Sequence, residues 1–111
     1  MTNDTTGTSV QVQDHPDRSR FEAVLGDQRV GLAAYTLGDG RITFTHTEVD
    51  DAAEGKGVGS ALASTGLDAA RERGLRVVPQ CPFIARYISR HHEYLDLVDE
   101  ADRRFVERAA G

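Results

Sequence analysis

Residues 54–62, EGKGVGSAL, place three glycines at alternate positions directly before an amphipathic pattern that predicts a helix over residues 60–73. Glycine adopts backbone conformations that other residues avoid, and it lets another group approach the main chain closely. The first N–H groups of a helix have no partner within the helix and, together with the helix dipole, attract anions. The stretch therefore predicts a loop that binds a phosphate or pyrophosphate, with a plain tight turn as the alternative.

Two common phosphate-binding loops do not fit this stretch. In the P-loop pattern a Ser or Thr follows the lysine, whereas Gly57 follows Lys56 here. The dinucleotide-binding pattern fails at Ser60, and no acidic residue ends the next expected strand to bind a ribose. The anion-binding interpretation therefore requires a loop of another kind.

The chain before the loop has the composition and spacing of short β-strands. Strands are expected at residues 10–13, 20–25, 29–37 and 41–49. Turn signals separate them, and GDG at residues 38–40 is a strong hairpin signal. Strands that follow one another this closely predict an antiparallel meander.

The chain after the loop alternates between helical and extended patterns. The expected elements are a helix at 60–73, a strand at 75–78, a helix at 83–91, a strand or extended segment at 94–98, and a polar helix with little apolar face at 99–110. Gly74 ends the first helix and Pro82 introduces the second. The order strand, loop, helix and strand predicts a βαβ unit.

Length, composition and charge narrow the class of protein. A chain of 111 residues corresponds to one domain, and its 39% apolar and 28% charged residues are typical of a globular protein. The net charge of −5 argues against a binder of nucleic acid or anionic membranes. We find no apolar run near the ~20 residues of a membrane span and no signal-peptide pattern, so we expect a cytoplasmic protein. One cysteine, Cys81, and four scattered histidines argue against a metal site.

The glycine loop, with the pattern around it, resembles the coenzyme A pyrophosphate motif of the GNAT superfamily of N-acetyltransferases. Residues 54–59, EGKGVG, are similar to the family pattern [QR]-x-x-G-x-[GA], with Glu54 where most members have Gln or Arg. Three further pieces strengthen the resemblance to its small single-domain branch: HTEV (46–49), VVPQCPF (77–83) and YISRHHEYLDLV (87–98). The resemblance implies an α/β fold in which an antiparallel meander precedes a βαβ acetyl-coenzyme A-binding unit.

The resemblance also implies where acetyl-coenzyme A would bind. The pantetheine arm would follow the end of the strand at 41–49, near Glu48 and Val49, and the acetyl group would point toward His46 and Cys81. The pyrophosphate would lie on the loop formed by Gly55, Lys56, Gly57, Val58, Gly59 and Ser60. Arg86 and Arg90, four residues apart on one helix face, would hold the 3′-phosphate, with a solvated basic face as the alternative.

Three side chains are candidates for the chemistry, and each has a structural alternative. Cys81 precedes a helix whose N-terminus would stabilise a thiolate, so it is a candidate nucleophile, a residue lining the thioester pocket, or a packing residue. His46 is a candidate base, and strand alternation would place it on the same face as Phe44 and Glu48. Glu48 is the rival base. Tyr87 departs from the family spacing of a helical tyrosine acid, which favours packing.

The sequence therefore predicts an acetyl-coenzyme A-dependent N-acetyltransferase with an unidentified amine acceptor. The alternative is a non-catalytic module that binds coenzyme A or a protein partner. The expected domain spans residues 10–98, between a disordered tail at residues 1–9 and a C-terminal extension at residues 99–111.

Overall fold

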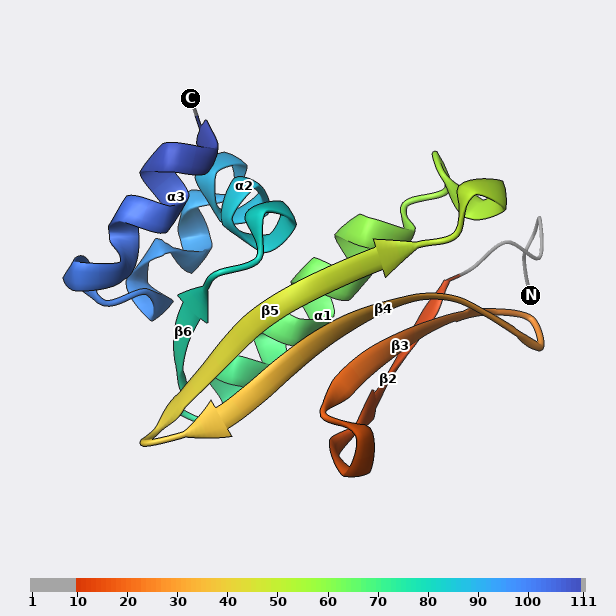
Figure 1. Ribbon diagram of the computed structural model, residues 1–111, viewed down its shortest axis with the longest axis horizontal. Coiled ribbons are helices and arrows are strands. Elements are labelled where there is room, and N and C mark those ends of the chain that lie inside the picture. Colours follow the sequence, from red (N-terminus) through yellow and green to blue (C-terminus); the bar gives the residue numbers. More distant parts are fainter. Residues whose placement is uncertain (1–9, 111) are drawn as a thin grey trace.

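The computed structural model describes residues 10–110, so the predicted tail at residues 1–9 lies outside the described residues. Within these described residues, five strands form one mixed sheet in the order β2-β3-β4-β5-β6 (Figure 1). Their bounds are β2 (Gln11–His15), β3 (Arg20–Leu25), β4 (Gln28–Gly38), β5 (Arg41–Val49) and β6 (Arg76–Pro79). The first four are antiparallel neighbours, and β6 runs parallel to β5. The expected α/β fold, with a meander followed by a βαβ unit, is confirmed.

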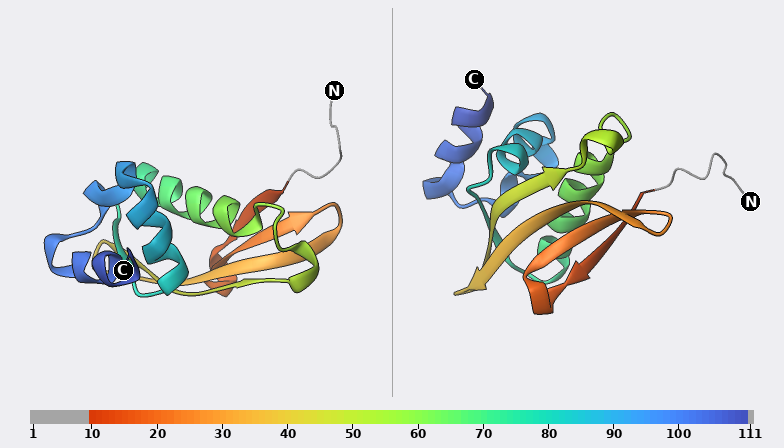
Figure 2. Two further views of the ribbon diagram at one scale, coloured as in Figure 1. Left: turned by 90° about the horizontal axis from the view of Figure 1, so that it is seen from above. Right: turned by 45° about the vertical axis from the view of Figure 1, so that its right-hand side comes forward.

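In the part of the chain that the structure describes, the α-helices are α1 (Val58–Glu72), α2 (Pro82–Arg90) and α3 (Arg103–Ala110). Short 3₁₀ turns connect the elements: η1 (Pro16–Arg18), η2 (Asp51–Ala53), η3 (His92–Leu97) and η4 (Glu100–Asp102). Figure 2 shows α1 lying along one face of the sheet, and Figure 1 shows α2 and α3 beside β6. We call the face of β2–β5 opposite α1 the open face. Within residues 10–110, no helix is long and apolar enough to cross a membrane.

The core lies between α1 and the sheet. Leu62 and Leu67 of α1 are completely buried there, as is Phe44 of β5. Gly66 allows α1 to approach the sheet closely, because a Cβ at this position would lie 3.0 Å from two atoms of the Phe44 ring. The helix therefore packs directly on an aromatic side chain of the strand that leads into the glycine loop.

A β-bulge in β5 reverses the direction of the side chains that follow it. Ala34 pairs with His46 but the next residue, Tyr35, pairs with Phe44, so Thr45 is an extra residue in the ladder. Phe44 points into the core, whereas His46 is largely exposed on the open face. The prediction that His46 shares a face with Phe44 is wrong, because simple alternation does not hold across the bulge.

Strands β5 and β6 separate beyond the bulge. β6 pairs only with residues Arg41–Phe44 of β5, after which the chain turns away into α2. Within the part of the chain that the structure describes, residues Thr45–Val49 have no strand partner on that side. The end of β5 therefore presents a free backbone edge next to the glycine loop.

The expected strand at residues 94–98 is absent from the structure, which has the turn η3 there. Tyr94 and Leu97 are both buried, and the Tyr94 hydroxyl donates a hydrogen bond to Asp68 of α1 at 2.8 Å. Residues three apart share a side of a 3₁₀ helix but lie on opposite sides of a strand. Burial of both side chains on one side therefore requires the helical conformation, and the prediction of a strand or extended segment is wrong.

The C-terminal helix is shorter than the expected range of 99–110 and starts at Arg103. Asp99 instead accepts hydrogen bonds from Arg41 of β5 at 3.0 Å and from Arg76 of β6 at 2.7 Å. Val106 is buried and is the apolar anchor of α3, which packs beside α2. The C-terminal extension thus contacts the sheet through the ion pairs of Asp99 and packs beside α2 with Val106 buried.

Candidate functional site

Two of the three loop glycines adopt a left-handed backbone conformation. Gly55 has φ +82° and Gly57 has φ +78°, values that side chains with a Cβ disfavour. Gly57 is the N-cap residue of α1, so the helix starts at Val58, two residues before the predicted start. The turn therefore ends with the first N–H groups of α1 at the mouth of the loop.

The third glycine makes room for an aromatic ring. A Cβ on Gly59 would lie 2.5 Å from the tip of the Phe83 ring, and its backbone φ is not left-handed. Phe83, the second residue of α2, is 41% exposed. Phe83 was not predicted from the sequence. Its spacing of three and seven from Arg86 and Arg90 places all three on one face of α2, which is the signal that would have found it.

A cavity of about 430 Å³ opens at the glycine loop. Ten residues line it: Thr47, Val49, Ala53, Glu54, Gly55, Gly57, Val58, Gly59, Ser60 and Phe83. The predicted loop residues thus lie together with Val49 of β5, whereas the exposed Lys56 is not part of the lining. Thr47 is a second residue that the sequence analysis missed. It lies two positions before Val49, so both point to the same side of β5.

A smaller cavity of about 150 Å³ lies next to the first one. It is lined by Ser60, Phe83, Arg86, Tyr87, Arg90 and His91. Ser60 and Phe83 line both cavities, so the surface continues from the glycine loop over Phe83 to the two arginines. The rings of Tyr87 and His91 stack at a centroid distance of 3.9 Å, and burial raises the pKa of the Tyr87 hydroxyl.

Cys81 lies beneath the main cavity and not in its wall. The residue is 3% exposed, and its backbone N–H donates a hydrogen bond to the Phe44 carbonyl at 2.8 Å. Its Sγ lies 3.2 Å from Oγ1 of Thr47, which does line the cavity. Of the three alternatives for this cysteine, packing behind Thr47 describes its position in this structure.

His46 and Glu48 form a hydrogen-bonded pair on the open face. The His46 Nε2 lies 2.8 Å from Glu48 Oε2, and the two side chains are 59% and 63% exposed. Thr47 between them points to the opposite side, toward Cys81. The structure therefore separates the predicted catalytic residues, with the His46–Glu48 pair on one side of β5 and Cys81 on the other.

The His46–Glu48 pair can act as a base. In the neutral tautomer in which Nε2–H donates to Glu48, Nδ1 carries the free lone pair that can accept a proton. Among residues 10–110, no group of three or more His, Cys, Asp and Glu is placed to hold a metal ion.

Comparison with known proteins relates most of this chain to one family. A family model described as "GCN5-related N-acetyl-transferase" matches residues 20–97. The chain is also similar to "Protein NATD1" from Gallus gallus, Mus musculus and Xenopus tropicalis, at 33%, 32% and 31% identity. The aligned segments cover 73–74% of this chain and 76% of each relative.

Proposed function

Because the chain belongs to the family of GCN5-related N-acetyltransferases, we propose that it binds acetyl-coenzyme A at the glycine loop and transfers the acetyl group to an amine. One observation carries the proposal. The loop cavity, with its helix N-terminus, adjoins the strand edge left free where β5 and β6 separate. A long cosubstrate with a diphosphate at one position and amide groups further along needs both features.

The loop supplies the diphosphate site. The backbone N–H groups at Gly57–Ser60 and the dipole of α1 attract the negative charge. No basic side chain is required in the wall, which suits a chain with a net charge of −5. Arg86 and Arg90, beyond Phe83, are proposed to hold the 3′-phosphate, because the second cavity connects them to Ser60.

The free edge of β5 supplies the site for the pantetheine arm. Its amide groups would pair with the backbone at Thr45–Val49 as an added strand would, over the side chains of Thr47 and Val49. This position brings the thioester to the middle of β5. Backbone N–H groups there would polarise the thioester carbonyl.

Direct transfer is the favoured route. The amine nitrogen forms a bond to the thioester carbon, the carbon–sulfur bond breaks, and coenzyme A leaves as the thiolate. His46 accepts the proton from the nitrogen, and Glu48 holds the ring and stabilises its charge. The route through an acetylated Cys81 is disfavoured because its sulfur lies buried behind Thr47. Intact-mass measurement after incubation with acetyl-coenzyme A separates the routes, since only the covalent one gives an acetyl adduct that Cys81→Ala loses.

A second candidate is a module that binds coenzyme A without catalysis. The position of the His46–Glu48 pair favours it, because the pair lies on the opposite side of β5 from Thr47 and Val49, which line the cavity. Release of free thiol from acetyl-coenzyme A in the presence of an amine panel distinguishes the candidates. An enzyme releases thiol only with an acceptor amine, whereas a binding module shows acetyl-coenzyme A binding without release.

The binding site itself is tested with a loop variant and a matched control. Gly57→Asp places a negative charge at the start of α1, and we expect it to abolish acetyl-coenzyme A binding in isothermal titration calorimetry. Gly38→Ala is the control, because Gly38 lies at the far end of β4 with open space around it. Unchanged binding by Gly57→Asp would contradict the proposed site.

A further inference from the structure

The open face of the sheet carries polar side chains in two rows across four strands. Each row consists of residues that pair across β2, β3, β4 and β5. The first row is His15, Arg20, Ala34 and His46, and the second row is Gln13, Glu22, Leu32 and Glu48. The neighbours of Glu22 in β3, Phe21 and Ala23, are buried in the core, which fixes the outward direction of these rows. The proposed base therefore shares its face with a second polar group.

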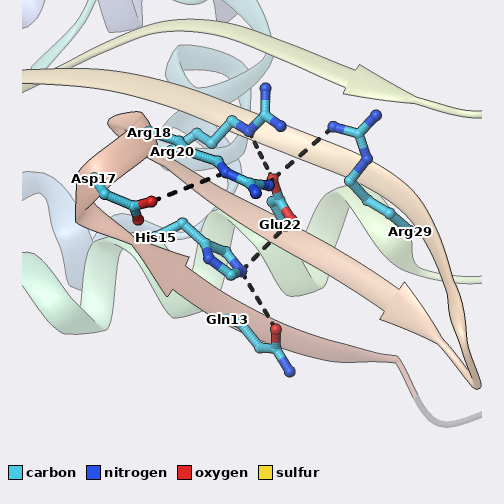
Figure 3. A network of polar contacts seen from close by, with 7 residues as sticks. All are labelled: Gln13, His15, Asp17, Arg18, Arg20, Glu22 and Arg29. Atoms are coloured by element: carbon cyan, nitrogen blue, oxygen red, sulfur yellow. Dashed lines mark hydrogen bonds and ion pairs between the residues drawn. The ribbon is translucent and has the colours of Figure 1, made fainter.

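That second group is built around one buried carboxylate (Figure 3). The Glu22 side chain is 8% exposed and accepts hydrogen bonds from Arg20 Nε at 2.7 Å and Arg18 Nη1 at 3.3 Å. Arg29 Nη1 lies 3.9 Å from the same oxygen, and His15 Nε2 lies 3.5 Å from the other. We call Arg18, Arg20 and Arg29 the basic cluster.

The basic cluster has more positive charge than its acidic neighbours neutralise. Three guanidinium groups face the carboxylates of Glu22 and Asp17, and the latter is 4.0 Å from Arg18 Nε. A guanidinium has five N–H donors, and within residues 10–110 the Nη groups of Arg20 form no hydrogen bond to protein. Arg18 and Arg29 are largely exposed. The cluster thus has both the charge and the free donors to hold an anion.

The basic cluster lies within reach of the proposed base. Arg20 pairs with Ala34, which pairs with His46, so two strand spacings separate them, or about 10 Å between Cα atoms. Ala34 and Leu32 form the low apolar floor between the two groups. A molecule lying across this floor would meet the His46–Glu48 pair at one end and the guanidinium groups at the other.

We propose that the acceptor is an anionic amine, which the basic cluster binds through its carboxylate or phosphate while the His46–Glu48 pair takes the proton from its nitrogen. The proton transfer to the His46–Glu48 pair rests on the proposed function, whereas the binding of the anion by the basic cluster does not. It adds the class of acceptor and makes the basic cluster a specificity determinant of the transfer. An extended tripeptide spans about 10 Å from its amine to its carboxylate and so matches the separation.

The test measures binding, so that it does not depend on turnover. Three probes are titrated by NMR into the full-length protein saturated with coenzyme A: trialanine, trialanine amide, and 6-aminohexyl phosphate. We expect the acid or the phosphate to bind at least about tenfold more tightly than the amide, as for one charge-assisted contact. The two anionic probes show which source of negative charge the cluster prefers. Equal binding of all three, or no binding, overturns the inference.

Two variants assign the preference to the cluster. Arg29→Gln and Arg18→Gln remove guanidinium groups that lie 3.9 Å and 3.3 Å from Glu22, and either should reduce the preference for the anionic probe about tenfold. Arg108→Gln on α3 is the matched control. An unchanged preference in both cluster variants overturns the inference.

Failure of the inference and failure of the proposed function give different results. If acetyl transfer occurs equally well with the acid and the amide, the enzyme stands and the acceptor class is wrong. If the anionic probe binds through the basic cluster but no acetylated amine forms, the recognition site stands and the transfer is wrong.

Discussion

At the scale of single residues, one side chain in the cavity wall opposes the proposed ligand. Glu54 lines the loop cavity. Most members of the GNAT superfamily, which the loop resembles, have Gln or Arg at this position. A carboxylate near a diphosphate is repelled by it, although water and salt weaken the effect at an exposed position. Replacing Glu54 therefore tests where the diphosphate lies.

We predict that Glu54→Gln binds acetyl-coenzyme A about two- to fivefold more tightly, as for removal of one exposed like-charge contact. Isothermal titration calorimetry at low and high salt measures the change, which salt should reduce. Glu72→Gln at the far end of α1 is the control and should bind as the wild type does. Equal affinity of the Glu54 variant and the wild type would place the diphosphate elsewhere.

Among the elements, α1 is held close to the sheet by the absence of one side chain. Alanine at Gly66 would favour the helix by ~1 kcal/mol, but its Cβ would lie 3.0 Å from the buried Phe44 ring. Overpacking in a core typically costs ~1–3 kcal/mol, so we predict a net loss of up to ~2 kcal/mol in the free energy of unfolding for Gly66→Ala. Urea unfolding measures it, and a more stable variant would refute the close approach.

The network on β3 predicts a pH dependence. Burial by itself raises the pKa of the Glu22 carboxyl, but the hydrogen bonds from Arg20 and Arg18 and the charges of Arg20 and His15 lower it overall, below its usual 4.5. A carboxyl whose pKa is depressed by folding stabilises the fold above its unfolded pKa, and this contribution is lost as the pH falls through the folded pKa. We predict that Glu22→Gln flattens the decline in stability below about pH 4.5. Glu100→Gln is the control, and an unchanged decline in the Glu22 variant would contradict the prediction.

At the scale of the whole molecule, local sequence patterns predicted the order of the elements better than the faces of their side chains. Glycine turns and alternating strands identified the meander, and the glycine loop identified the start of the βαβ unit. The bulge at Thr45 was not predictable, because it depends on how β5 pairs with β4. It decides that His46 and Glu48 point to the open face while Thr47 points toward Cys81.

The loop residues of the site were predicted, whereas its aromatic wall was not. Gly55, Gly57, Gly59, Ser60 and Val49 line one cavity, and their binding of the cofactor stays a prediction. The helical spacing of Phe83 places it on one face with Arg86 and Arg90, but its contact with Gly59 depends on how α2 packs against α1. Likewise, residues 94–98 form the turn η3, which buries both Tyr94 and Leu97 and bonds the Tyr94 hydroxyl to Asp68 of α1. Contacts between distant elements decided each of these cases.

The most direct test of the central claim is NMR mapping of the residues that respond to acetyl-coenzyme A. We predict that backbone amide signals shift at residues 55–60, along residues 45–49 and at Phe83, while those of β2 remain unchanged. Gly57→Asp should abolish the shifts. Shifts confined to other parts of the molecule, or no shifts at saturating cosubstrate, would contradict acetyl-coenzyme A binding at the glycine loop.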